Sequence, residues 1–226
     1  MLNKIATAAQ KGPANKYIRL TVEVATVLAM LAYSAFPLAI FLNKAYFWHG
    51  LVSTLTEPGQ PHYMFFTSID IISSLFGIIL FGYLSWRERW DKVQSVVLIL
   101  VVVACVGEVL TDLFSLPTGY STIGDIPTVH YATTHPALII HLVASFVNSA
   151  AFVVSFGLWV MHRRRTETRS VVREVVFAIT LSVGLVGTVI GYIFPVTSPT
   201  LQRVFILCYC YWFITLPYDS FALKPN

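Results

Sequence analysis

Three carboxyl groups and one histidine fall inside long apolar stretches of this sequence, where ionisable side chains are rare. Asp70 lies about two turns into one stretch. Glu108 and Asp112 are four residues apart in another, on one face of a helix, and His141 lies near the start of a third. A carboxylate at membrane depth costs about 2.5–3.5 kcal/mol, so such residues usually face a protein interior and mark a functional path. These four are the first candidates for a site.

Further polar residues lie where they could join this group. Asn148 is two turns beyond the intramembrane histidine on the same face, while Glu57, His130, His135 and Arg203 precede apolar stretches. Carboxylate oxygens and imidazole nitrogens are ligands for a divalent metal such as zinc. The guanidinium could instead hold a phosphate-bearing head group, and buried carboxyl groups could transfer protons. The composition of the group leaves these three chemistries open.

If the protein is an enzyme, the group favours metal-assisted hydrolysis of a lipid-like substrate. Asp112 and His141 would be metal ligands with His135 or His130 as the third, and a metal-bound water would be the nucleophile. The spacing of these histidines matches no established metal motif. The sequence also lacks a Walker A loop, an H-E-x-x-H pair and a G-x-S-x-G elbow.

Structural interpretations of the same residues stand beside the functional ones. Asp70 or Asp112 could pair with Arg203 and clamp two helices together, since charges inside membranes usually pair. His141 and Asn148 could be hydrogen-bonding contacts between helices.

The elements that must position these residues are six apolar stretches, each near the roughly 20 residues needed to cross a bilayer as a helix. Alternating short strands are absent, so the sequence predicts an all-α polytopic bundle of six transmembrane helices. The predicted spans are Thr21–Leu42, Tyr63–Trp86, Val93–Leu116, Pro136–Met161, Val175–Phe194 and Val204–Phe221.

The distribution of charge predicts the orientation of this bundle. Of the fifteen Lys and Arg residues, all but Lys44 and Arg203 fall on one side of the six spans. Short-loop Lys and Arg stay on the cytoplasmic side, so both termini are expected there. Asp70, Asp112 and His141 then fall in the outer half of the bilayer, with Glu108 one turn deeper. The sequence therefore predicts an outward-facing polar site in a cell-membrane protein.

Composition excludes several other classes of protein. Hydrophobic residues make up 56% of the chain and charged residues 12%, against about 25% charged in soluble domains. The net charge of +4 lies in juxtamembrane loops, so the expected partners are membrane lipids and not nucleic acid. We expect a basic cytoplasmic segment over residues 1–20 and one transmembrane domain over residues 21–223, with Trp86 and Trp159 at the inner interface. The sequence names no protein partner or homo-oligomer.

Several short motifs are similar to those of a known family. They are STLTEPGQPHY at Ser53–Tyr63, TDLFSLP at Thr111–Pro117, HPALIIHLVASF after a loop histidine, and Gln202-Arg203 followed by Trp212. Together they resemble the multi-pass prokaryotic membrane family catalogued as domain of unknown function 998, over roughly residues 20–222. The resemblance implies a six-helix membrane protein, mainly bacterial or archaeal, with no established activity. It draws attention to Glu57, Asp112, His141 and Arg203 as a group.

Three functions follow from these observations. The first is a site that binds or processes a lipid or other amphiphile, with Asp70, Glu108, Glu57, Arg203 and Asn148 as binding residues. The second is a non-catalytic membrane module that assembles with a partner protein. The third is a small proton-coupled transporter, against which stands the absence of a broken helix pair at the midplane.

Overall fold

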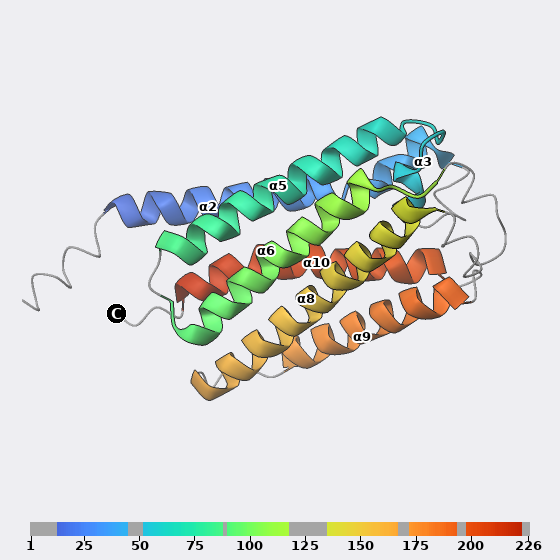
Figure 1. Cartoon of the computed structure of the whole chain (residues 1–226). Coiled ribbons are helices and arrows are strands. Elements are labelled where there is room, and N and C mark those ends of the chain that lie inside the picture. Colours follow the sequence, from blue (N-terminus) through green and yellow to red (C-terminus); the bar gives the residue numbers. More distant parts are fainter. Residues whose placement is uncertain are drawn as a thin grey trace, which may run out of the picture.

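The computed structural model describes residues 13–44, 52–87, 90–117, 135–166, 172–193 and 198–222, and within these ranges it contains helices and no strand (Figure 1). The long helices are α2 (Pro13–Tyr33), α5 (Tyr63–Arg87), α6 (Lys92–Leu113), α8 (Pro136–Thr166), α9 (Val172–Ile193) and α10 (Ser198–Ala222). Short elements η1 (Phe36–Leu38), α3 (Ala39–Leu42) and η2 (Val52–Thr56) complete the described fold.

The long helices lie side by side and alternate in direction along the chain (Figure 1). One end of the bundle holds α3 and the start of α8, and we call it the η2 end because η2 packs there. We call the opposite end, where α2 begins and α10 finishes, the terminal end. Close packing joins α6 to α5 and α8, α10 to α9 and α2, and α2 to α5. The connections from α5 to α6 and from α9 to α10 are short, which explains why each of these pairs packs as antiparallel neighbours.

Four segments are long and apolar enough to cross a membrane, so the chain is a multi-pass membrane protein. They are Leu20–Leu42, Tyr63–Trp86, Lys92–Leu113 and Pro136–Arg164. In α9 the apolar stretch is shorter and covers Glu174–Val186. The all-helical prediction is confirmed, while the spanning of α9 and α10, and the cytoplasmic termini, stay predictions. Large apolar side chains such as Leu31, Ile79 and Val176 are more than half exposed, as expected for a surface that contacts lipid.

The first predicted span is not one continuous helix. Its α-helix ends at Tyr33, and the chain continues through η1, which contains Pro37, into the short α3. Proline has no N–H to donate and its ring clashes with the preceding turn, so an α-helix cannot pass through it undisturbed. The break turns the chain across the η2 end of the bundle, and Phe36 and Ala39 are buried there against Leu55 and Phe66.

The connection between the first two spans, which the sequence suggests is a loop, contains a buried helical turn. In η2 the side chains of Thr54, Leu55 and Thr56 are buried, and η2 packs against α5 and α10. The backbone N–H of Val52 donates to Gln202 Oε1 on α10 over 2.6 Å. This contact fixes η2 across the end of the bundle, where it forms part of the cavity described below.

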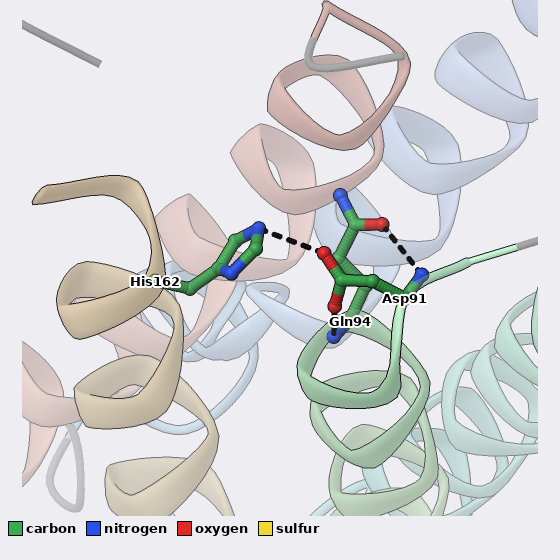
Figure 2. Close-up of polar contacts among 3 residues, drawn as sticks. All are labelled: Asp91, Gln94 and His162. Atoms are coloured by element: carbon green, nitrogen blue, oxygen red, sulfur yellow. Dashed lines mark hydrogen bonds and ion pairs between the residues drawn. The ribbon is translucent and has the colours of Figure 1, made fainter. Parts of the chain in front are cut away.

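Polar contacts tie the helices together at the terminal end (Figure 2). Asp91 caps α6 by accepting from Gln94 N over 2.9 Å, and the Gln94 side chain accepts from Asp91 N over 3.2 Å. This reciprocal capping box satisfies two N–H groups that the helix itself cannot pair. The other carboxylate oxygen of Asp91 lies 3.1 Å from His162 Nε2 on α8, so one residue both starts α6 and joins it to α8.

Aromatic side chains form the core of the bundle between α8, α9 and α10. Phe152 lies against Phe205 and Tyr209, with ring centroids 5.6 and 4.7 Å away. Nearer the terminal end, Trp212 Nε1 donates to Ser155 Oγ over 3.1 Å. Trp159 is only 1% exposed, so it packs inside the bundle, and α8 continues beyond it to Thr166. Its position at the inner membrane interface stays a prediction.

Candidate functional site

A cavity of about 610 Å³ lies inside the half of the bundle nearer the η2 end. Its wall is formed by side chains from α2, α5, α6, α8, α9, α10 and η2. Three of these side chains carry carboxyl groups, namely Asp70, Glu108 and Asp112. The remaining lining residues on α8, α9 and α10 are mostly apolar, and hydroxyl or amide groups are contributed by α6, α8, η2 and the start of α10. The cavity therefore combines a largely apolar lining with a limited set of polar groups.

Glu108 is held by two donors from different helices. Tyr33 OH on α2 donates to Oε1 over 2.8 Å, and Asn148 Nδ2 on α8 donates to Oε2. Hydrogen bonds to a carboxylate are about twice as strong as neutral ones, and they fix the orientation of the acceptor. Glu108 thereby joins α2, α6 and α8 at one point on the cavity wall.

Close contact between α6 and α8 makes this arrangement possible. Gly107, the residue before Glu108, faces α8 so closely that a Cβ there would lie 3.0 Å from Ala144 O and 3.0 Å from Asn148 Cβ. One turn nearer the η2 end, Thr111 Oγ1 donates to Gly107 O over 2.9 Å and lies 3.4 Å from Ser145 Oγ. A small residue lets two helix backbones approach, which brings polar side chains into contact.

Three buried polar atoms of cavity-lining residues have no hydrogen-bond partner among the described residues, namely Asp112 Oδ2, Asn148 Oδ1 and Ser53 Oγ. Asp112 is 6% exposed and Asn148 is 7% exposed, and the unpaired oxygens of the carboxylate and the amide accept hydrogen bonds. Asp70 is half-buried on α5 and is close enough to Glu108 and Asp112 to interact with them electrostatically. A buried polar atom without a partner costs about 1–3 kcal/mol, so these atoms call for a donor in the cavity.

The cavity reaches the side of the bundle that faces lipid. Phe146 and Val154 both line it, and they are 73% and 49% exposed. In the part of the chain that the structure describes, the backbone of α8 lies close to α6 and has fewer close approaches to α9 and α10. Toward the terminal end, Phe205 lines the cavity and its ring contacts Phe152, so the aromatic core closes that end. Among the described residues, the exposed lining side chains of α8 thus indicate a lateral opening beside this helix.

His141 is buried at the end of α6, outside the lining of the cavity. It is 1% exposed and does not line the cavity. Its Nδ1 lies 2.9 Å from Thr111 O and 3.2 Å from Phe114 O, so that nitrogen carries the proton and donates to the end of α6. The last carbonyls of a helix have no partner within the helix, and a side-chain donor satisfies them.

The other expected site residues are more dispersed. Glu57 is buried directly after η2, His135 immediately precedes α8, and Arg203 is partly buried beside Gln202 on α10, but none of the three lines the cavity. His130 lies outside the described residues. In the part of the chain that the structure describes, no group of three or more His, Cys, Asp and Glu could hold a metal ion. The three-ligand metal set with His130 stays a prediction.

Tyr33 is the residue of this site that sequence reasoning missed. A tyrosine near the end of an apolar helix resembles an ordinary interfacial residue. The available signal was Pro37, which ends the helix early and leaves Tyr33 in its last turn, level with Glu108 on α6.

A protein-family model matches most of the chain. The model described as "Protein of unknown function (DUF998)" matches residues 24–217, which is most of the chain. No curated protein and no solved structure matches the sequence.

Proposed function

We propose that this chain, which belongs to the DUF998 family, binds an amphiphilic molecule in the cavity of its helix bundle and takes it up from the surrounding bilayer. The single observation that carries the proposal is the mixed lining of the cavity. Carboxyl, amide and hydroxyl groups line it together with apolar residues such as Val153, Leu185 and Ile206.

The size of the cavity supports a small amphiphile as the occupant. Pockets for small molecules usually measure about 300–1,000 Å³, are mostly apolar, and place a few polar groups to fix orientation. A largely apolar cavity of about 610 Å³ whose lining includes three carboxyl groups matches that description. A water-soluble metabolite would leave the apolar lining uncovered, whereas a purely apolar lipid chain would leave the carboxyl groups without partners.

The lateral opening supports entry from the membrane. Phe146 and Val154 stand at the border between the cavity and the lipid-facing surface. An apolar tail can therefore enter beside α8 without crossing water. Because the Lys and Arg residues cluster near the terminal end, we propose that this end faces the cytoplasm and that the cavity lies in the outer half of the bilayer.

The test uses one substitution that fills the cavity and one that does not. Ala150 lines the cavity, whereas Val147 lies one turn away on the same helix and is not among the lining residues. Wild-type protein, Ala150→Phe and Val147→Phe are purified from the same membranes in a neutral detergent, and the retained amphiphiles are quantified by mass spectrometry.

We expect about one amphiphile for each wild-type and Val147→Phe chain, and loss of that molecule from Ala150→Phe. Equal retention by all three proteins would mean that the bound molecules cover the outside of the bundle, which contradicts the proposal. Thermal unfolding of each variant shows whether the fold is retained.

A further inference from the structure

The buried atoms on the cavity wall that lack hydrogen-bond partners indicate the chemistry of the amphiphile's head group. Two of the three unpaired buried atoms, Asp112 Oδ2 and Asn148 Oδ1, are hydrogen-bond acceptors, and the third, the Ser53 hydroxyl, can accept as well as donate. A second carboxylate on the wall, Glu108, already accepts from Tyr33 and Asn148. What the wall still needs is a ligand that donates hydrogen bonds.

The charges on the cavity wall favour a cationic head group, which can also donate hydrogen bonds. Three carboxyl groups line the cavity, and no Lys, Arg or His is among its described lining residues. An anionic head, such as a phosphate or a carboxylate, would meet like charge without a compensating cation, which costs several kcal/mol. A cationic head would be attracted to the carboxylates in a medium of low dielectric constant.

A bare metal ion does not explain the rest of the cavity. The volume of about 610 Å³ greatly exceeds what one ion fills, and much of the wall is apolar. The described residues also contain no group of three or more side chains placed to hold a metal. An organic cation with an apolar tail uses both the polar groups and the apolar lining.

We propose that the ligand is an amphiphile whose head is an ammonium group bearing N–H bonds, which donates to Asp112 Oδ2 and Asn148 Oδ1 while its apolar tail lies along Val153 and Leu185. This assignment rests on the proposed binding of an amphiphile in the cavity and adds the class of head group. A quaternary ammonium carries the same charge but has no N–H, so it cannot satisfy the two acceptors.

Four single-chain probes of equal length separate charge from hydrogen bonding. Dodecylammonium has charge and N–H donors, dodecyltrimethylammonium has charge alone, dodecanol is neutral, and dodecanoate is anionic. Their binding to the full chain in phosphatidylcholine nanodiscs is measured by equilibrium dialysis, and binding to empty nanodiscs is subtracted.

We expect dodecylammonium to bind at least tenfold more tightly than each of the other three probes. In Asp112→Asn that preference should fall at least tenfold while the affinity for dodecanol changes less than twofold. Asp70→Asn, at the half-buried carboxyl group, is a second variant in case Asp112→Asn does not fold. Asp91→Asn, at the terminal end, is the charge-matched control and should keep the full preference.

The outcomes separate this inference from the proposed function. If all four probes bind equally and Ala150→Phe abolishes their binding, the cavity binds amphiphiles but the ammonium assignment is wrong. Equal binding of the two cations, or a preference that survives both Asp112→Asn and Asp70→Asn, also overturns the assignment. If no probe binds better to the wild type than to Ala150→Phe, the proposed function fails with it.

Discussion

Replacing Tyr33 by phenylalanine tests whether Glu108 joins three helices in the way the structure describes. The substitution removes one hydroxyl, whose hydrogen bond to Glu108 Oε1 is 2.8 Å long, and keeps the ring contact with Tyr209 at 5.3 Å. Hydrogen bonds to charged groups contribute about 1.5–3 kcal/mol in soluble proteins. Between helices in membranes, measured values average about 0.6 and reach about 1.7 kcal/mol.

The expected loss from Tyr33→Phe is therefore about 1–2 kcal/mol of unfolding free energy, which is a factor of roughly 5 to 30 in the folded fraction. Reversible unfolding in mixed micelles with increasing dodecyl sulfate measures it. Tyr211 is 41% exposed on α10 and contacts Phe177 through its ring, so Tyr211→Phe serves as the matched control and should cost less than about 0.5 kcal/mol.

A double-mutant cycle that combines Tyr33→Phe with Glu108→Gln isolates the interaction between these two side chains. We expect a coupling free energy of about 1 kcal/mol between Tyr33 and Glu108, since residues that share a hydrogen bond couple by about 0.5–3 kcal/mol. If Tyr33→Phe and Tyr211→Phe lose the same stability, and the coupling is zero within error, Glu108 is not held as described.

Three further substitutions test the packing around the site. Gly107→Ala should destabilise the bundle by about 1–3 kcal/mol because its Cβ would press on α8, whereas Gly82→Ala, which has nothing within 4 Å, should be neutral or slightly stabilising in thermal unfolding. His141→Ala should lose about 1–3 kcal/mol of unfolding free energy because the imidazole donates to backbone carbonyls. The loss should be the same with and without a chelator. A loss that disappears with the chelator would indicate a metal role instead. Asp91→Ala should lose about 1 kcal/mol of denaturation free energy through its helix cap while Asp91→Asn retains most of it, and equal losses would show that the ion pair matters more than the cap.

Much of the helical architecture was predictable because the bilayer imposes it. A stretch of about 20 apolar residues can satisfy its backbone in lipid only as a helix, so the helices around Asp70, Glu108 and Asn148 follow from hydropathy alone. The positions at which the helices end were less predictable from the sequence. Helix α8 continues to Thr166 through charged residues, because a helix can extend beyond the membrane where hydropathy no longer marks it.

The pairing of side chains depends on the rotation and close approach of the helices, which hydropathy and charge patterns do not reveal. Hydropathy and charge bias set the depth of Glu108 and Asp112, but the rotation of each helix decides what they face. Asn148 contacts Glu108 because Gly107 lets α6 and α8 approach. Likewise, His141 and Asp112 lie at similar depth by sequence, yet the histidine turns to the carbonyls of Thr111 and Phe114 while Asp112 faces the cavity.

The most direct test of the central claim is to locate a bound amphiphile in the full chain. A dodecylamine carrying a diazirine at the far end of its tail is photoactivated with the protein in nanodiscs, and the labelled residues are identified by peptide mass spectrometry. We expect labelling at the apolar lining residues Val153, Val154 and Leu185, and we expect that labelling to be lost in Ala150→Phe, in which the new side chain fills the cavity. Labelling spread evenly over lipid-facing residues such as Leu28 and Ile79, and unchanged in Ala150→Phe, would contradict it.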